Sequence, residues 1–438
     1  MKPKLYSLGA GPGDIGKAIS LHRAGKLEPA RRIYQGILTT RPNHVEALHF
    51  LGVLLHQSGQ SDQAITSIER AIVLAPDYAD AHNNLGNIFR ETNQFEAAFR
   101  AYQRVVELVP GHADGWNNLG VLLRGRGEYE EADKAYLRAI ALNPSHVAAR
   151  QNRGSLLARL HRFDEAVATY KKVLELRPRD AAAYDALSRT LYRAGRIEEA
   201  IAVYHEWLKS DAGNSVALHM LAACTGEGAP ARASDRYVRD TFDAFAGNFD
   251  QVLDQLGYRA PALIGEWLEQ ALPTADGSLV VADAGCGTGL CADFLRPRAK
   301  HLVGVDLSAG MLARARARNQ YDRLVEAELS AWFASQQPDY DLIVSADTLC
   351  YFGALEEVLS GAARVLRSGG RLVFTVESAD RADTYRLNPT GRYGHAEGYV
   401  REVLLRAMLE TIGIEPAVLR RERGSEVAGL LVSARRAG

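Results

Sequence analysis

A glycine-rich turn at residues 285–289 carries the clearest chemical signal in this chain. The apolar run 280–282 leads into Asp283 and then into Gly285, Gly287 and Gly289. Glycine at alternate positions lets the backbone turn tightly and approach a ligand without a Cβ atom in the way. The N–H groups of the helix expected to follow would point at that ligand. The sequence therefore predicts a buried strand that ends in a ligand-binding turn.

A second acid indicates what the ligand contains. The apolar run 302–305 ends at Asp306, so two neighbouring strands are each expected to finish in a carboxylate. A carboxylate at the end of the second strand can accept hydrogen bonds from both hydroxyls of a ribose. Dehydrogenases that bind NAD share this arrangement, but their glycine fingerprint is G-x-G-x-x-G and this one is G-x-G-x-G. The spacing therefore weakens the alternative of an NAD-binding domain.

The glycine loop and four later segments, taken together, resemble class I S-adenosyl-L-methionine (SAM)-dependent methyltransferases. Their motifs occur here in the same order, at residues 283–289, 305–312, 327–329, 341–347 and 366–374. The family usually has Pro at the position of Ser368 and Asp at that of Glu328. The resemblance covers residues 234–435. It implies a Rossmann-like α/β domain with a seven-stranded sheet, an antiparallel last strand and SAM as the cofactor.

The resemblance also implies which side chains bind SAM. Asp306 would hold the ribose, Met311 would pack on the adenine, and Asp283 would lie nearest the methionine moiety. Asp347, at the end of the fourth strand, would contact the SAM amino group or the acceptor, or else cap the next turn. The cofactor residues expected on this basis are Tyr237, Asp283, Gly285, Cys286, Gly287, Gly289, Asp306, Leu307, Met311, Glu328, Leu329 and Asp347.

Four aromatic residues recur along one side of the helix expected near residue 240. In the simplest interpretation Tyr237, Phe242, Phe245 and Phe249 pack a core. The same stretch resembles the N-terminal segment of a bacterial group of methyltransferases that contain tetratricopeptide repeats (TPRs), where a Tyr-Val pair is followed by two Phe-Asp pairs. In related enzymes a helix of this kind covers the SAM pocket. We therefore expect a lid helix with Tyr237 over the cofactor, where it would exclude water.

Candidate catalytic residues lie in the segment 387–395, which resembles a late insertion of the same group. Methyl transfer from a sulfonium is an in-line displacement, so much of its catalysis comes from holding the nucleophile close. A general base is needed only for an acceptor that arrives protonated. The candidates are His395, which titrates near neutrality and is expected in a loop, and Tyr393, with Tyr351 as a further one. Arg392 would either fix an anionic group on the acceptor or remain a surface charge.

The N-terminal half repeats itself every 34 residues. Proline recurs at this step from Pro42 to Pro178, and alanine from Ala30 to Ala200. With its Leu-Gly and Glu-Ala pairs, this period resembles the TPR. Pro ends each second helix because it cannot continue the backbone hydrogen bonding. We expect a flexible tail over residues 1–12, six TPRs over 13–214, a capping helix and linker over 215–230, and the methyltransferase domain over 231–438.

Three asparagines share the same period. Asn84, Asn118 and Asn152 stand just before the Gly of their repeats, a position that faces the concave groove in TPR superhelices. An asparagine amide can both donate to and accept from a peptide backbone, so a ladder of them suits an extended peptide. The alternative is that they bond neighbouring helices or water. The groove interpretation predicts a peptide or protein partner.

Composition excludes several other classes of function. Lys and Arg number 52 against 53 Asp and Glu, a net charge of −1 that gives no electrostatic argument for nucleic acid or an anionic membrane. No apolar run approaches the length of a membrane span, and the start has no convincing signal peptide. The four cysteines form no C-x-x-C pair, which favours free thiols in a cytoplasmic protein. No cluster has metal-ligand spacing, so we expect no metal.

Residues 8–14 resemble the opening loop of tetrapyrrole methylases, but over that stretch alone, and we expect a tail there.

Two functions from different classes remain. One is an active methyltransferase, with O- or N-methylation favoured, whose TPR solenoid recruits or presents the acceptor. The other is a non-catalytic TPR adaptor whose methyltransferase fold senses SAM or is vestigial. The intact glycine loop and Asp306 favour the enzyme. A homodimer is possible in either case.

Overall fold

The computed structural model describes residues 14–379, 382–422 and 424–438. The chain forms two compact units that divide after Gly195. The predicted tail, and all of the motif at residues 8–14 except Asp14, lie outside the described residues. No helix within the described ranges is long and apolar enough to cross a membrane.

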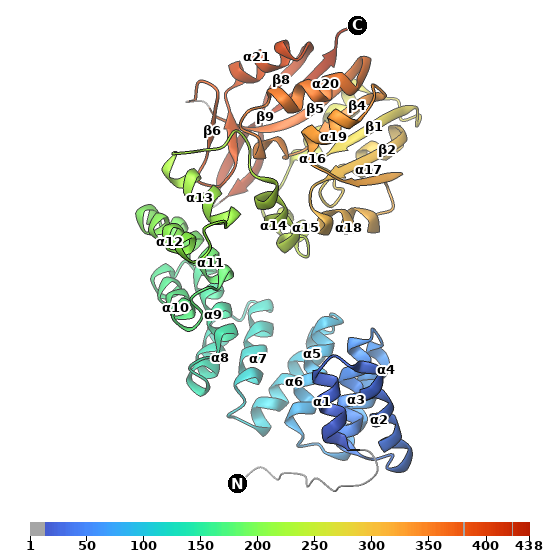
Figure 1. Cartoon of the computed structure of the whole chain (residues 1–438), viewed down its shortest axis with the longest axis vertical. Helices are drawn as coiled ribbons and strands as arrows, with labels where there is room; N and C mark the ends of the chain where they lie inside the picture. The colour runs from blue at the N-terminus through green and yellow to red at the C-terminus, as the bar shows by residue number, and fades with distance from the viewer. Residues whose placement is uncertain (1–13, 380–381, 423) are drawn as a thin grey trace. The chain divides into compact units, whose positions relative to one another are not determined.

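The N-terminal unit consists of paired helices that follow the 34-residue period (Figure 1). In this unit they are α1 (Ile15–Arg23), α2 (Leu27–Thr40), α3 (Val45–Gln57), α4 (Ser61–Leu74), α5 (Ala79–Glu91), α6 (Phe95–Leu108), α7 (Ala113–Gly125), α8 (Tyr129–Leu142), α9 (Val147–Arg159), α10 (Phe163–Leu176) and α11 (Ala181–Arg193). The turn inside each pair contains a residue with left-handed φ, which is why glycine recurs there. These residues are Gly25, Gly59, Asn93, Gly127, His161 and Gly195. The predicted TPR solenoid is confirmed.

A glycine on the first helix of a repeat lets the second helix approach closely. A Cβ atom added at Gly120 would lie 2.8 Å from the ring of Tyr136, which is fully buried. The same contact recurs at 2.6 Å between Gly86 and Tyr102. The periodic glycine and tyrosine of the sequence are therefore the two halves of one packing contact.

The division between the units falls inside the sixth predicted repeat. Helix α12 (Ile197–Ser210) belongs to the C-terminal unit, where it packs on α13 (Ser215–Thr225). Helix α13 ends at Gly226, which has a φ of 74°. The compact units thus divide before the linker expected at residues 215–230. Helix α13 is bonded into the C-terminal unit through His219, whose Nε2 lies 2.8 Å from the carbonyl oxygen of Gly391.

A mixed sheet forms the centre of the C-terminal unit. Its order is β3-β2-β1-β4-β5-β7-β6, and β9 pairs antiparallel with both β5 and β8. The strands are β1 (Leu279–Ala284), β2 (Ala299–Asp306), β3 (Arg323–Glu326), β4 (Tyr340–Ser345), β5 (Leu366–Ser378), β6 (Tyr385–Leu387), β7 (Tyr393–His395), β8 (Leu409–Glu422) and β9 (Ser425–Arg436). The predicted class I fold with an antiparallel last strand is confirmed. The short strands β6 and β7 are additions from the insertion at 385–395.

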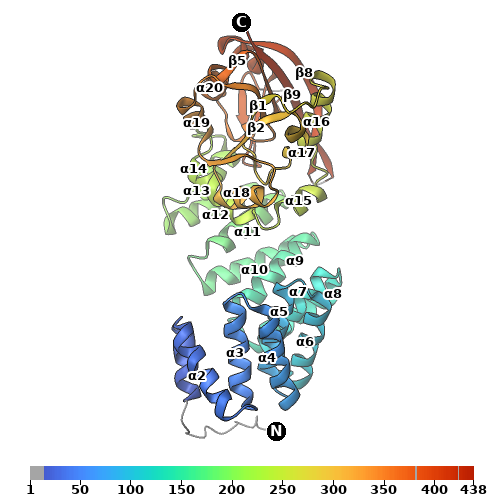
Figure 2. The ribbon, with the colours of Figure 1, turned by 90° about the vertical axis from the view of Figure 1, so that its right-hand side faces the viewer.

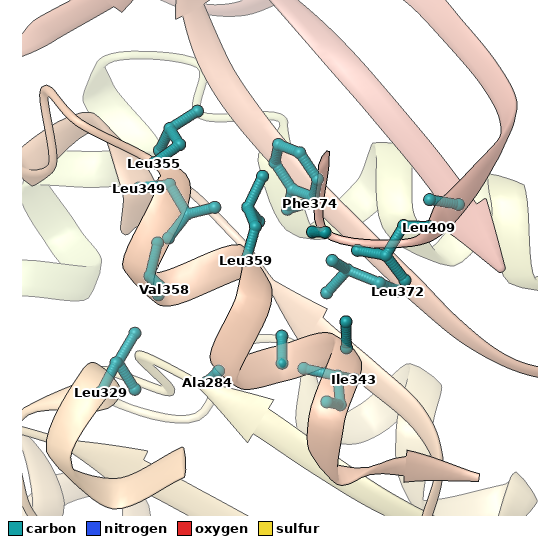
Figure 3. Close-up of a cluster of buried hydrophobic side chains, with 14 of the residues drawn as sticks. Ala284, Leu329, Ile343, Leu349, Leu355, Val358, Leu359, Leu372, Phe374 and Leu409 are labelled. Carbon is teal, nitrogen blue, oxygen red and sulfur yellow. The ribbon is translucent and has the colours of Figure 1, made fainter. Parts of the chain in front are cut away.

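Helices cover both faces of this sheet. Helices α19 and α20 lie on one side of it and α16 and α17 on the other (Figure 2). Alternation along β4 explains this, because Ile343 packs toward the first pair of helices while Leu342 and Val344 pack toward the second. Figure 3 shows the first of these cores. The helices of the domain are α14 (Asp235–Phe245), α15 (Phe249–Gln255), α16 (Ala260–Ala271), α17 (Ala292–Leu295), α18 (Ala309–Ala317), α19 (Leu329–Ser335), α20 (Glu356–Val365) and α21 (Glu397–Arg406).

Two glycines of α7 give a matched test of the repeat packing. Gly120→Ala should destabilise the protein by about 1–3 kcal/mol, because the added methyl group overpacks the contact with Tyr136. Gly125→Ala, in the same helix, places its methyl group where no atom lies within 4 Å and should stabilise it by about 0.5–1 kcal/mol. Urea unfolding measures both. A Gly120→Ala protein as stable as the wild type would show that the helices can separate without cost.

Candidate cofactor site

The glycine loop after β1 adopts a conformation that other residues would strain. Gly285, Gly287 and Gly289 have φ values of 79°, 53° and 89°. A Cβ atom at Gly285 would lie 2.1 Å from the Thr348 hydroxyl oxygen, whereas one at Gly287 would meet nothing within 4 Å. Position 285 therefore requires glycine, because a side chain there would collide with Thr348. Gly287 borders open space that a ligand can use.

Asp306 joins this loop to the one after β2. Its Oδ2 accepts a hydrogen bond from the Gly287 N–H at 2.9 Å, and its Oδ1 accepts one from the Ser308 N–H at 2.8 Å. Burial raises the pKa of this carboxyl, although both backbone donors favour the ionised form. Each oxygen keeps a further lone pair. The carboxylate is thus fixed in place and fits the two hydroxyls of a ribose.

Asp283 is the other acid that the sequence predicts at this edge of the sheet. It is fully buried, and its Oδ2 accepts a hydrogen bond from the Tyr321 hydroxyl at 2.6 Å. Its Oδ1 has no partner among the described residues. The pKa of this carboxyl is raised to about 7, mainly by burial and in part by the negative charge of the nearby Asp306. A buried carboxylate oxygen without a donor is costly, and an ammonium group of a ligand would supply one.

The remaining cofactor candidates surround the same two loops. Met311 and Leu329 are buried, as an apolar surface against adenine requires, and Leu307 is half-buried. Cys286 is buried in the glycine loop, and burial raises the pKa of its thiol. Glu328 is already engaged, because its two carboxylate oxygens accept hydrogen bonds from the backbone N–H groups that begin α19. Its main observed role is therefore that of a helix cap.

The predicted lid helix is α14, which lies beside α18 (Figure 1). The ring of Tyr237 stacks on His219 of α13 with centroids 4.0 Å apart, and its hydroxyl lies 3.8 Å from the Met220 sulfur. The structure thus brings Tyr237 to α13. From the same segment it brings two acids, Asp243 and Asp250, to the cofactor loops. The sequence analysis missed both, although the repeated Phe-Asp pair was the signal that could have found them.

Both candidate catalytic residues lie inside the protein. His395 lies in β7, so the expectation that it lies in a loop is wrong. Its Nε2–H donates to the carbonyl oxygens of Phe352 at 2.8 Å and Gly353 at 3.1 Å. Burial lowers the pKa of His395 to about 4. Tyr393 is equally buried, and its hydroxyl donates to the Pro230 carbonyl oxygen at 2.7 Å. These bonds give both side chains a structural role that the sequence did not predict.

A buried charge network follows the carboxyl ends of β4 and β5. Arg420, 1% exposed, pairs with Asp347 at 3.2 Å, with Glu422 at 2.7 Å and with Glu377. Arg392 pairs with Glu422 at 2.7 Å. The carboxylate of Asp347 therefore forms an ion pair with Arg420. The backbone of Asp347 has a left-handed φ of 51°. Arg392 is not the surface charge that one interpretation expected. Nothing in the sequence near either arginine indicates this network, because its members come from distant segments.

The asparagines of the predicted groove form bonds between neighbouring repeats. Each amide nitrogen reaches a residue 35 positions earlier in the chain. The pairs are Asn84 with His49 at 2.7 Å, Asn118 with Asn83 at 3.2 Å and Asn152 with Asn117 at 2.9 Å. In the part of the chain that the structure describes, the amide oxygens of Asn84 and Asn152 have no protein partner. These oxygens remain available to accept hydrogen bonds from a bound chain.

The sheet order, the glycine turn and the two strand-end acids define a class I methyltransferase fold. Comparison with known proteins leads to the same class. Residues 282–374 match the methyltransferase domain family, and residues 15–79, 57–113, 83–147, 117–180 and 152–215 match the tetratricopeptide repeat. Residues 282–374 thus match a methyltransferase domain, and the matches within residues 15–215 are to tetratricopeptide repeats.

Individual relatives match only parts of the chain. Human methyltransferase-like protein 27 is 46% identical over 84 residues, 19% of this chain and 34% of that protein. A malonyl-[acyl-carrier protein] O-methyltransferase of Enterobacter lignolyticus is 38% identical over 101 residues, 23% of this chain and 39% of that enzyme. The chain thus spans less than two fifths of either relative's length. The crystal structure of MamA is 30% identical, with a TM-score of 0.35, over 40% of this chain and 99% of that one.

The buried charge of Asp283 predicts a pH dependence of stability. Its folded pKa of about 7 exceeds the ordinary value of 3.8, so the folded state binds the extra proton between these values. The contribution of Asp283 to the free energy of unfolding therefore falls as the pH rises from 4 to 7. Asp283→Asn keeps an acceptor for Tyr321 but cannot ionise. It should be the more stable protein at pH 8, by up to about 4 kcal/mol, and similar to the wild type at pH 4.

Urea unfolding of both proteins at pH 4, 6 and 8 measures this difference. If the two stabilities run parallel over the whole range, Asp283 does not carry the shifted pKa.

Proposed function

We propose that this protein is a SAM-dependent methyltransferase that uses the site at the carboxyl ends of β1 and β2. The observation that carries the proposal is the Asp306 carboxylate, which is held against the Gly287 N–H beside open space. A carboxylate fixed in this way can accept hydrogen bonds from a ribose without having to be ordered first. The open space at Gly287 leaves room for the ligand backbone to pass.

When bound, SAM supplies an electrophilic methyl group on a sulfonium cation. The residues of this chain bind and orient it. Asp306 accepts from the ribose hydroxyls, Met311 and Leu329 supply apolar contact to the adenine, and the unpartnered oxygen of Asp283 accepts from the ammonium. Because the ionised Asp283 carboxylate attracts the ammonium more strongly than the neutral carboxyl does, SAM affinity should rise as the pH increases from 6 to 7.

The residues of the site indicate the cofactor more directly than they indicate which atom receives the methyl group. O- or N-methylation is favoured, and oxygen gains support from the relative that is a malonyl-[acyl-carrier protein] O-methyltransferase. Burial lowers the pKa of His395 to about 4, and Tyr393 donates its hydroxyl hydrogen to the Pro230 carbonyl oxygen, so neither side chain is well placed as a general base. An acceptor that is already ionised, such as a carboxylate, needs no base.

The TPRs would bind a peptide or protein partner, or present the acceptor. The amide oxygens of Asn84 and Asn152 support this role as acceptors for a bound backbone. A cytoplasmic location and a homodimer stay predictions.

A non-catalytic adaptor that senses SAM is the second candidate function. The observation in its favour is that both predicted bases serve structural bonds. It shares the cofactor site with the first candidate and differs in lacking methyl transfer.

Calorimetric titration of the full chain with SAM and S-adenosylhomocysteine tests the cofactor site. We expect dissociation constants of about 1–100 μM, near −8 to −5 kcal/mol. Gly287→Arg should weaken binding at least tenfold, because the side chain enters the open space and the φ of 53° disfavours it. Gly369→Arg is the matched control, since Gly369 also has a left-handed φ and open surroundings but lies at the start of β5.

Absence of binding to the wild type would overturn the proposal for both candidates. Binding that Gly287→Arg retains would place the ligand elsewhere.

A further inference from the structure

Two acids that precede the sheet reach the loops of the cofactor site. We propose that Asp243 and Asp250 are positioning residues that hold these loops in their binding conformation, through the latch segment formed by α14 and α15 (235–255). This inference rests on the proposed function, because it concerns the same site. Neither residue belongs to the motifs at the strand ends.

Asp243 holds the loop after β2. Its Oδ1 accepts hydrogen bonds from the Ser308 hydroxyl at 2.5 Å and from the Gly310 N–H at 3.0 Å. Ser308, which is fully buried, accepts from the Met311 N–H with the same hydroxyl and donates its own N–H to Asp306. Asp243 therefore orients the residue that orients the predicted ribose-binding carboxylate.

Asp250 holds the glycine loop. Its Oδ1 accepts a hydrogen bond from the Thr288 hydroxyl at 2.5 Å, and its Oδ2 pairs with the Arg318 guanidinium at 2.7 Å. The Arg318 Nε–H donates to the Thr288 carbonyl oxygen at 2.7 Å. Thr288, 2% exposed, stands between Gly287 and Gly289 and is thus held at both its hydroxyl and its carbonyl group.

The two contacts act from one rigid segment. The ring of Phe249 packs edge-on against Phe242, with centroids 6.1 Å apart, and against Phe245, with centroids 5.5 Å apart. These contacts join α14 to α15, so Asp243 and Asp250 are held in a fixed relation.

The hydrogen bonds form a chain across the site, and the latch segment joins its two ends into a ring. It runs from Asp243 through Ser308 to Asp306, on to Gly287 and Thr288, and ends at Asp250. A glycine-rich loop is intrinsically free to adopt other conformations, and each one adds an ordering cost to binding. Fixing the loop before the ligand arrives removes that cost. The ring therefore predicts that losing either acid weakens cofactor binding more than it weakens the fold.

The test uses the full chain and S-adenosylhomocysteine as the probe. Asp243→Ala and Asp250→Ala should each raise the dissociation constant about 5–50-fold, while Asp254→Ala, an exposed acid on α15, should leave it within twofold. Asp243→Asn is the conservative variant. Because a single oxygen of Asp243 accepts both hydrogen bonds, Asn keeps that acceptor and should restore most of the affinity.

Hydrogen exchange without ligand gives a readout that a purely structural role would not move. Exchange should become faster in residues 285–291 for Asp250→Ala and in 306–312 for Asp243→Ala, with the amides of β5 and β9 unchanged. Affinity and loop exchange that match the wild type in both alanine variants would overturn the latch. Global loss of protection, with the Asn variant no better than Ala, would overturn it as well.

The two proposals fail in different ways. If the wild type does not bind the probe, the proposed function fails, while loop exchange still reports on the latch. If the wild type binds and the alanine variants bind equally well, only the latch fails.

Discussion

The carboxylate of Asp306 is the constraint on which the site depends. Its two oxygens accept from N–H groups on two loops that follow different strands, at Gly287 and at Ser308. The glycine loop can offer its N–H only because its residues take left-handed φ values. Neighbouring parallel strands bring the two loops to the same edge of the sheet. One side chain thereby converts two flexible turns into a single surface that is ordered before a ligand arrives.

The helix that carries Asp243 has a second neighbour. Asp240 of α14 accepts a hydrogen bond from the Ser215 hydroxyl of α13 at 3.0 Å, and Tyr237 stacks on His219 of the same helix. His219 in turn bonds Gly391 in the insertion before β7. Helix α14 therefore contacts α13 on one side and a cofactor loop on the other. This explains why α13, which the sequence joined to the repeats as a cap, is part of the C-terminal compact unit.

Much of the fold could be predicted from the sequence because its signals are local or periodic. In the third, fourth and fifth repeats the 34-residue step places one glycine, one tyrosine and one proline in each helix pair, and the strand-end acids lie beside the turns they serve. The contacts that complete the site are of another kind. Asp243 and Ser308 are 65 residues apart, and Arg420 and Asp347 are 73 apart. No local pattern reports such pairs.

His395 shows how a local pattern misleads. Its neighbours Gly391, Gly394 and Arg392 indicate a polar loop, and in isolation they would form one. The insertion instead adds β7 to the end of β5, through pairing at Glu377 and Ser378, and buries the imidazole against a turn after β4. The pairing of β7 with β5 therefore decides the local structure, and no residue near His395 in the sequence predicts that pairing.

Electrostatics gives an independent reason to favour SAM over a dinucleotide. Asp283 is buried and the nearby Asp306 is half-buried; each carboxyl has a raised pKa, and Asp243 raises the pKa of Asp306 further. Their mutual repulsion marks a region of negative potential. A pyrophosphate placed there would be repelled. The ammonium and sulfonium of SAM would be attracted, and binding them would relieve the repulsion between the acids. The charge of the site thus supports the proposed cofactor, whereas the fold, which is shared with NAD-binding proteins, does not distinguish the two.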